Sequence, residues 1–313
     1  MTADGVWAVV TSYRPEAGLL RALTALSDQV DQIVVVDDGS GPEAAPVLEA
    51  AQSAGSRVVR LRDNSGIAVA LNAGIRAALD QGARAVVTFD QDSVVQAGFV
   101  RALLTARDAV RRTGRRHGPV VPEYFADVRQ VHSVEHDGTL VARHAIQSGM
   151  LLDRELLETV GLMREDLFID LVDTEFELRC AAAGLPTIAA PGLTLAHALG
   201  RQYERRMLGR IVRLPGIPPV VTLSNPFRYY YRVRNRLVVN REFWRAQFGW
   251  VARDTLLEAL HYGNALLLAR PRRALWRLYL SAARDARRGR MGRMPSGLAE
   301  LASTISWAAP PAE

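Results

Sequence analysis

Short apolar runs alternate with helical patterns through the first part of the chain. The runs are rich in valine and isoleucine and lie at 6–10, 33–36, 58–61 and 85–88. Between them, leucine recurs at the three- and four-residue spacing of an amphipathic helix, as in 19–26. Strands that alternate with amphipathic helices are typical of a parallel sheet covered by helices on both faces. The pattern therefore predicts an α/β fold with a mainly parallel central sheet.

Polar residues follow these runs at the positions where the strands should end. Those that can bind a ligand are Thr11, Tyr13, Asp37, Asp38, Asp90 and Asp92. Ligands of parallel sheets bind beyond the carboxyl ends of the strands, so the clustering predicts a binding site at that edge. Asp90 and Asp92 stand one residue apart and can share one divalent cation with a diphosphate bound to it. Magnesium and manganese prefer such oxygen ligands, which predicts a metal site here.

A competing motif lies after the second run. Gly39 and Gly41 match the glycine fingerprint of dinucleotide-binding folds, and Asp63 lies near the expected ribose-binding position. However, Asp37 and Asp38 stand directly before the glycines, where they would repel a pyrophosphate seated on a helix N-terminus. The match also follows the second strand and not the first. We therefore interpret the glycines as turn residues and disfavour a nicotinamide enzyme.

A second group of carboxylates lies at 168–176, where the chain leads into a helical pattern that Gly184 ends. Asp173 is placed to be the N-cap of that helix, with Glu175 in its first turn. A capping carboxylate that also faces a cleft can serve as a general base, so the two roles are compatible.

Two further segments carry residues that are candidates for contact with a ligand or a metal ion. Ser148 and Gly149 precede another predicted helix, and Gly149 allows close approach of the backbone to a ligand. His197 follows a short predicted strand at 186–190. It becomes a third metal ligand if the fold brings it beside Asp92.

The pattern changes in the C-terminal part. A helix is predicted to open at Asn225, and more helical pattern follows to the end of the chain, with aromatic and leucine faces bordered by arginine. Such faces suit a membrane interface. Packing on the catalytic domain or on another subunit, as in a homo-oligomer, accounts for them equally well. No recognisable RNA-binding module accompanies them, so no nucleic-acid partner is expected.

Composition and charge narrow the class of protein. The 313 residues are 49% hydrophobic, with net charge +6. The sequence contains no lysine, and its arginines are most frequent after Arg201. This asymmetry predicts an anionic partner for the C-terminal part. The single cysteine, Cys180, excludes an internal disulfide. Neither a signal peptide nor an apolar stretch of the roughly 20 residues that span a bilayer is visible, so we expect a cytoplasmic protein, peripheral on the inner face of the membrane.

The motifs taken together resemble family 2 glycosyltransferases, and within them the bacterial rhamnosyltransferases that use dTDP-rhamnose to build cell-surface polysaccharides. The motifs are Thr-Ser-Tyr at 11–13, Val-Asp-Asp-Gly-Ser at 36–40, Asn64-x-Gly66, Phe-Asp-Gln-Asp-Ser at 89–93, Val-Asp-Thr-Glu-Phe at 172–176 and His197-x-x-Gly200. The resemblance covers roughly 6–240. It implies a GT-A fold, the fold of nucleotide-diphospho-sugar transferases, and transfer with inversion at the anomeric carbon.

The resemblance also implies roles for individual residues. The residues that it places around the nucleotide-sugar donor are Thr11, Tyr13, Asp37, Asp38, Asn64, Gly66, Asn72 and Asp90. It makes Asp92 a ligand of Mg²⁺ or Mn²⁺, with His197 as an additional ligand. Ser148 and Gly149 are candidate contacts with the acceptor or the donor sugar.

The same resemblance makes Asp173 the catalytic base. Many relatives carry a carboxylate directly before this aspartate, whereas the present chain has Val172 there. Asp170 and Glu175 therefore remain open as alternative bases.

We expect an inverting, metal-dependent glycosyltransferase that moves rhamnose from dTDP-rhamnose to a cell-surface glycan or polyprenyl-linked acceptor. A GT-A catalytic domain is expected at 1–222, with its nucleotide-binding half at about 1–115 and its acceptor half at about 116–222. An amphipathic helical region at 223–313 follows. Two alternatives stay open: a transferase of the same fold that uses another nucleotide sugar, and a catalytically silent nucleotide-sugar-binding subunit of a polysaccharide assembly complex.

Overall fold

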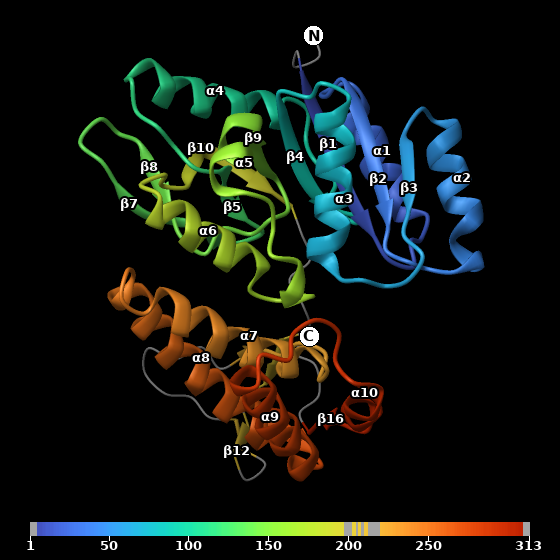
Figure 1. Cartoon of the computed structure of the whole chain (residues 1–313), viewed down its shortest axis with the longest axis vertical. Helices are drawn as coiled ribbons and strands as arrows, with labels where there is room; N and C mark the ends of the chain where they lie inside the picture. The colour runs from blue at the N-terminus through green and yellow to red at the C-terminus, as the bar shows by residue number, and fades with distance from the viewer. Residues whose placement is uncertain (1–4, 197–201, 205, 208–209, 212–219, 309–313) are drawn as a thin grey trace. The chain divides into compact units, whose positions relative to one another are not determined.

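The computed structural model describes residues 5–196, 202–204, 206–207, 210–211 and 220–308 (Figure 1). The chain divides into two units. The first contains Met1–Phe168 and Val172–His197, and the second contains Ile169–Leu171 and Ala198–Glu313. The three residues Ile169–Leu171 thus belong with the second unit, although their neighbours on both sides in the sequence belong with the first.

The first unit is built on one ten-stranded sheet. Its strands are β1 (Val6–Ser12), β2 (Gln32–Asp37), β3 (Arg57–Arg60), β4 (Ala85–Asp90), β5 (Val120–Phe125), β6 (Val128–Arg129), β7 (Val131–Val134), β8 (Leu140–Ala142), β9 (Met150–Asp153) and β10 (Ile188–Leu195). Their order is β3-β2-β1-β4-β9-β5-β10-β8-β7, with β6 paired to β5. The first four strands pair in parallel, as do β5 and β10, and the other pairs are antiparallel.

Helices cover both faces of this sheet (Figure 1). They are α1 (Gly18–Ser27), α2 (Ala45–Ser53), α3 (Ile67–Asp80), α4 (Phe99–Arg112), α5 (Arg154–Val160) and α6 (Val172–Ala182). The main core joins alternate residues of the strands, such as Ala8 and Val10, to leucines of α1, α2 and α4. On the opposite face Val9 meets α3, where a Cβ on Gly74 would lie 2.4 Å from Val9 Cγ1. Glycine therefore allows α3 to approach the sheet closely.

The predicted α/β fold is confirmed, and the four predicted N-terminal strands form the parallel half of the sheet. The hydrophobic pattern missed two central strands, β5 and β9. It also set the strand before His197 at 186–190, whereas β10 continues to Leu195. Strand β5 carries Pro122 and Glu123, which are both poor strand signals, and β9 is only four residues long and runs directly into α5.

The second unit is mainly helical. Its helices are α7 (Arg228–Phe243), α8 (Phe248–Leu268), α9 (Arg272–Arg287) and α10 (Ser296–Ser303). Short two-stranded pairings join β11 (Gln202–Glu204) to β14 (Val220–Thr222), β12 (Arg206–Met207) to β13 (Arg210–Ile211) and β15 (Ala269–Arg270) to β16 (Ser306–Trp307). Tyr229 of α7 is fully buried at the centre of an aromatic cluster that includes Tyr279 and Trp307. None of the helices described here is long and apolar enough to cross a membrane.

Candidate functional site

The carboxyl ends of β1, β2 and β4 meet at one edge of the sheet. In the register of these strands, Thr11 lies opposite Asp90, and Ser12 lies opposite Asp37. Three segments that the sequence predicted to carry ligand-binding groups are therefore neighbours in space. Thr11, Ser12 and Asp37 are buried, while Asp90 is half-buried at the end of its strand.

Tyr13 extends this edge with an aromatic surface. The residue is 39% exposed, and the guanidinium of Arg14 lies 5.2 Å from the ring centroid. The backbone of Tyr13 is held by Gln91, whose Oε1 accepts a hydrogen bond from the Tyr13 N–H at 2.9 Å. An exposed ring on a fixed backbone is a surface on which a nucleobase can stack.

Asp37 closes the turn after β2. Its carboxylate accepts hydrogen bonds from the hydroxyl and from the backbone N–H of Ser40. Gly39 has φ +68°, and a Cβ there would lie 2.4 Å from the carbonyl carbon of Asp63. These contacts support the interpretation of the glycines as turn residues. They give Asp37 a structural role beside the candidate site.

Asp38 holds the loop between β3 and α3. Its two carboxylate oxygens accept hydrogen bonds from the backbone N–H groups of Ser65 at 2.7 Å and Gly66 at 3.0 Å. Gly66 has φ +97°, and a Cβ on it would lie 2.4 Å from the carbonyl oxygen of Phe168. Asp38 thus shapes the loop that carries Asn64 and Gly66, and glycine is required where this loop meets the segment before α6.

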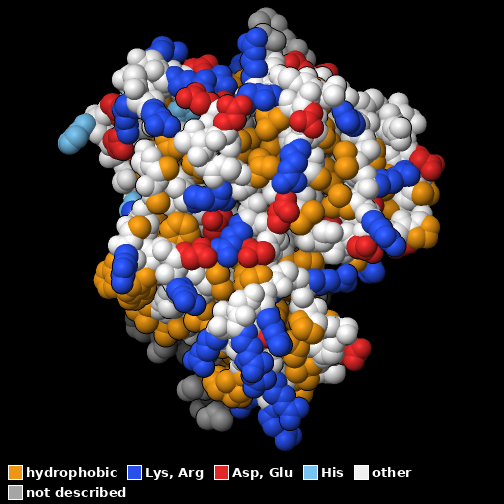
Figure 2. Space-filling model, in the orientation of Figure 1, with side chains coloured by type: hydrophobic (Ala, Val, Ile, Leu, Met, Phe, Trp, Pro, Cys, Tyr) orange, Lys and Arg blue, Asp and Glu red, His pale blue; other side chains and the backbone are white. Residues whose placement is uncertain are grey.

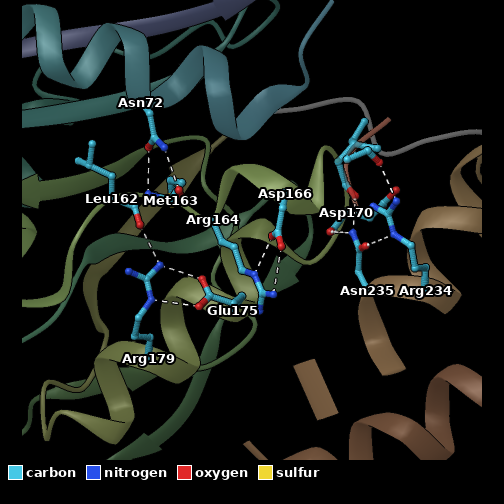
Figure 3. Close-up of polar contacts among 12 residues, drawn as sticks. Asn72, Leu162, Met163, Arg164, Asp166, Asp170, Glu175, Arg179, Arg234 and Asn235 are labelled. Atoms are coloured by element: carbon cyan, nitrogen blue, oxygen red, sulfur yellow. Dashed lines mark hydrogen bonds and ion pairs between the residues drawn. The ribbon is translucent and has the colours of Figure 1, made fainter. Parts of the chain in front are cut away.

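Asn72 is engaged within the protein (Figure 3). The residue is 1% exposed, and its side-chain Nδ2 donates to the carbonyl oxygen of Met163 and to Glu165 Oε1. Its Oδ1 accepts a hydrogen bond from the Met163 N–H at 2.9 Å. The amide therefore ties α3 to the segment 163–165. These bonds favour a structural role over the donor contact that the resemblance implied.

Asp90 is joined to the loop before β9. Gln147 Nε2 donates to Asp90 Oδ1, and the Asp90 N–H donates to Ser148 Oγ at 3.1 Å. Ser148 is fully buried, and its hydroxyl is also bonded to the hydroxyl of Ser93 at 2.7 Å. Gln147 was not among the residues predicted from the sequence, because a lone glutamine in a loop carries no signal. Its contact with Asp90 emerges only from the fold.

Gly149 is constrained by packing. It has φ +82°, and a Cβ would lie 3.1 Å from both Leu195 Cδ2 and Phe99 Cζ. Its N–H donates to the carbonyl oxygen of Thr88 at 2.7 Å. The need for glycine here is thus explained by the neighbouring side chains, and no ligand has to be invoked.

The predicted metal ligands are described only in part. Asp92 is exposed after β4, two residues beyond Asp90. His197 lies outside the described residues. Within the described part of the chain, no three histidine, cysteine, aspartate or glutamate side chains gather as a ligand set. The pair Asp90 and Asp92 nevertheless offers hard oxygen donors of the kind that Mg²⁺ and Mn²⁺ prefer.

Asp173 lies in the first turn of α6. The helix begins at Val172, two residues earlier than the predicted start at Thr174, so Asp173 is not its N-cap. Its Oδ1 accepts a hydrogen bond from the Thr174 N–H at 2.8 Å, and the residue is half-buried. An acidic residue in the first turn is favoured by the helix dipole.

The two alternative bases are both bound by arginine. Asp170 accepts hydrogen bonds from Arg228 Nε and Nη2, the shortest at 2.7 Å. Glu175 is 4% exposed, and its carboxylate accepts hydrogen bonds from Nε and Nη2 of Arg179 at 3.0 and 2.8 Å (Figure 3). Charge-assisted bonds of this kind occupy part of the acceptor capacity of each carboxylate.

Glu177 is a buried acid one helical turn beyond Asp173. It is 2% exposed, its Oε2 accepts a hydrogen bond from the Ala145 N–H at 3.2 Å, and its Oε1 has no hydrogen-bond partner. Burial raises the pKa of Glu177 to about 8, and the charge of Asp173 adds to the increase. The residue is therefore largely protonated at neutral pH.

Three other buried polar atoms near this edge lack a hydrogen-bond partner within the protein. They are Ser12 Oγ, Asn64 Oδ1 and Gln147 Oε1. A buried polar atom left unpaired costs roughly 1–3 kcal/mol, so such atoms are expected to meet water or a ligand. Their position at the carboxyl ends of β1 and β3 and beside Asp90 agrees with a polar ligand at this edge.

A pocket lined by arginines lies at the other end of the strands. It includes Arg111, Arg115 and Asp153. Asp153 pairs with Ala85 at the start of β4, far along the strand from Asp90. Both arginines are already bound to carboxylates, Arg111 to Asp153 and Arg115 to Asp137. This pocket is therefore separate from the candidate site.

The sequence matches known proteins over most of its length. A family model described as Glycosyl transferase family 2 matches residues 7–113. The dTDP-rhamnosyl transferase RfbF of Shigella flexneri is 32% identical over 251 residues, which cover 76% of this chain and 81% of RfbF.

Solved structures share the fold at low sequence identity. GalNAc-T7 with UDP, GalNAc and Mn²⁺ superposes with a TM-score of 0.50 at 16% identity, covering 76% of this chain and 48% of GalNAc-T7. Residues 1–349 of S. aureus TarS in complex with UDP-GlcNAc superpose with a TM-score of 0.49 at 16% identity, covering 91% of this chain and 92% of the TarS chain. The likeness to GalNAc-T7 confirms the expected GT-A fold. This chain spans less than half of the GalNAc-T7 chain.

The buried acid makes stability depend on pH. The pKa of Glu177 is raised to about 8 in the folded protein, so between its ordinary value and 8 the unfolded chain releases a proton that the folded chain retains. Stability should therefore fall as pH rises through this window. Glu177→Gln should remove that part of the dependence. The Tm of the variant minus the Tm of the wild type should therefore increase as the pH is raised from 5 to 8. The exposed Glu300→Gln variant is the control; a Tm difference for Glu177→Gln that stays constant with pH would contradict the account.

Proposed function

This chain belongs to glycosyl transferase family 2, and we propose that it moves rhamnose from dTDP-rhamnose to a hydroxyl group of a cell-surface glycan or polyprenyl-linked acceptor. The choice of donor is supported by the 32% identity to the dTDP-rhamnosyl transferase RfbF. The observation that carries the proposal is the polar edge at which Thr11 lies opposite Asp90, with Gln147 bound to Asp90. An edge of this kind suits a nucleoside diphosphate, whose sugar and phosphate oxygens need polar partners.

For the donor, we propose that Tyr13 stacks on the nucleobase and that Asn64 and Asp90 contact the ribose or the sugar. The exposed ring of Tyr13 and the unpaired Oδ1 of Asn64 support these roles. Asp37 and Asp38 hold the neighbouring turns through backbone N–H groups, so their part is to shape the site. The donor set proposed here leaves out Asn72, because its amide is engaged by Met163 and Glu165.

A divalent cation, Mg²⁺ or Mn²⁺, is part of the proposal. Asp92 would hold it, with His197 as a further ligand and Asp90 next to it. When bound, the cation offsets the negative charge that develops on the departing nucleoside diphosphate. Gln147 Nε2 donates a hydrogen bond to one oxygen of Asp90 and so helps to orient its carboxylate.

Asp173 is the proposed catalytic base. Its carboxylate accepts the proton of the acceptor hydroxyl while the oxygen of that hydroxyl bonds to the anomeric carbon. The bond from the anomeric carbon to the phosphate oxygen breaks in the same displacement, and its electron pair leaves with the nucleoside diphosphate. A single displacement inverts the anomeric configuration. The position that the resemblance gives to the base supports Asp173, while Arg228 binds the alternative Asp170 and Arg179 binds the alternative Glu175.

The helices of the second unit carry an apolar surface that suits a membrane interface. Its exposed members are Trp244, Phe248, Leu256, Leu257, Leu260, Leu267, Trp276 and Leu280. Exposed arginines accompany them on the same helices, among them Arg253 and Arg277, and Figure 2 shows hydrophobic and arginine side chains exposed together on these elements. We propose that this surface binds anionic lipid on the cytoplasmic face of the membrane, where a polyprenyl-linked acceptor is anchored.

Removal of the metal-binding carboxylate should uncouple donor binding from the cation. Asp92→Asn keeps the shape of the exposed residue, so the fold should persist while the Mg²⁺- or Mn²⁺-dependent part of dTDP affinity is lost. Calorimetric titration of dTDP with and without each cation measures this. The exposed Asp127→Asn variant is the matched control. An Asp92→Asn protein with unchanged metal dependence would remove Asp92 from the site.

Removal of the proposed base should slow turnover without weakening the protein. Asp173→Asn preserves shape, so melting temperature and dTDP affinity should change little, while turnover falls roughly 10²–10⁴-fold. The comparison uses Asp170→Asn and Glu175→Gln, whose carboxylates are bound by arginine and whose loss should lower the melting temperature. A fully active Asp173→Asn enzyme would transfer the role to another carboxylate.

Vesicle binding tests the membrane surface. The protein should float with anionic vesicles at low salt and less so at high salt, because arginine contacts are screened. Replacing Leu256 and Leu260 together by Asn should weaken binding roughly 10-fold, since two apolar side chains lose their insertion. Val134→Asn, an exposed apolar residue of β7, should have no effect. Absence of binding at low salt would favour a second copy of the chain as the partner of this surface.

A further inference from the structure

The turn that leads into α6 has an unusual backbone. Phe168, Asp170 and Leu171 have φ values of +68°, +64° and +61°, a region that residues with side chains rarely adopt. Such residues persist only where the surrounding structure holds them, and they cluster at functional sites. Asp173, the proposed base, comes two residues after this turn. The contacts that hold the turn therefore bear on where α6 starts.

One buried amide binds two consecutive carbonyl groups of this turn (Figure 3). Asn235 of α7 is fully buried, and its Nδ2 donates to the carbonyl oxygens of Ile169 and Asp170, both at 2.9 Å. Arg234 fixes the orientation of the amide, because its Nε donates to Asn235 Oδ1 at 3.0 Å. A guanidinium can only donate and a carbonyl can only accept, so the amide fits in one orientation alone.

Arg234 is itself held rigidly. It is fully buried, its Nη1 donates to the carbonyl oxygen of Gly292 at 2.6 Å, and its guanidinium lies 5.3 and 5.1 Å from the rings of Tyr230 and Tyr231. The orientation of Asn235 thus rests on the core of the helical unit and not on a mobile surface side chain.

A charged pair holds the side chain of the same turn. Arg228, at the start of α7, donates from Nε to both carboxylate oxygens of Asp170 at 3.2 Å and from Nη2 to Oδ1 at 2.7 Å. The side chain of Asp170 is only 9% exposed. Residues of α7 therefore bind both the backbone carbonyl group and the side chain of Asp170. On the preceding side, the carbonyl oxygen of Phe168 accepts a hydrogen bond from the Ile67 N–H at 2.9 Å.

We propose that Asn235 and Arg228 are positioning residues, which hold the turn 169–171 with Asp170 and Leu171 at positive φ and so aim the carboxylate of Asp173. The proposal rests on the proposed role of Asp173 as the base. We call the contacts of Asn235 and Arg228 with this turn the tether. Without the tether, the turn can relax to ordinary backbone angles and rotate the first turn of α6. A misplacement of about 1 Å can cost a reaction roughly 10²-fold in rate.

The test compares two asparagines of the same helix. Asn235→Ala removes the tether, whereas Asn240→Ala removes a bond to Thr255 Oγ1 (2.7 Å) that does not involve the turn. Well below the melting temperature, Asn235→Ala should lower kcat about 10- to 100-fold with unchanged KM for the donor. Hydrogen exchange in the segment 166–178 should become faster. The Asn240→Ala control should show neither change, even where it lowers the melting temperature equally.

Two further variants keep the test decisive. Arg228→Gln alters a partly exposed side chain and should fold even where Asn235→Ala does not, with the same loss of kcat and faster exchange. In the Asp173→Asn background, Asn235→Ala should cause no further loss, because the tether acts through Asp173. Additive losses, or unchanged kcat and exchange in both tether variants, would overturn the proposal. A fully active Asp173→Asn enzyme would overturn the base assignment instead, while exchange still reports separately whether the tether holds the turn.

Discussion

Parallel hydrogen bonding of β1 to both β2 and β4 brings the ends of three strands to one edge of the sheet. Because parallel strands run in the same direction, residues that are far apart in sequence, such as Thr11 and Asp90, become direct neighbours there. Antiparallel pairing of β4 with β9 then brings Gln147 and Ser148, which precede β9, to the same edge. The positions of Thr11, Asp90 and Gln147 at this edge depend on these strand pairings.

The candidate carboxylates of the first unit differ in burial. Asp37, Asp38 and Glu175 are buried and receive hydrogen bonds from backbone N–H groups or from arginine, so their charges stabilise turns and helix α6. Asp92, the proposed metal ligand, is exposed, and Asp173, the proposed base, is half-buried. Buried charge is tolerated only when it is paired, which accounts for the hydrogen bonds that the buried carboxylates receive.

The sequence predicted the parallel half of the sheet because its strands are strongly apolar and are punctuated by helical patterns. It missed β5, which contains Pro122 and Glu123, and it placed the start of α6 two residues late. Strand ends revealed Asp90 and Asp92, since two carboxylates after a buried run are a visible pattern. Gln147 and Asn235 could not be found in this way, because their importance lies in contacts between residues distant in sequence. Asn72 illustrates the opposite case: a motif position that the fold uses for structure.

The central claim is that this family 2 glycosyltransferase uses its polar sheet edge to transfer rhamnose from dTDP-rhamnose. The most direct measurement follows nucleotide release from dTDP-rhamnose, other dTDP-sugars, UDP-sugars and GDP-sugars, with Mg²⁺ or Mn²⁺ and a polyprenyl-linked glycan acceptor present. The account predicts release of dTDP from dTDP-rhamnose above all other donors, together with a product of inverted anomeric configuration. Preferred release from a UDP- or GDP-sugar would contradict the donor assignment, and release from none of them would contradict the catalytic role itself.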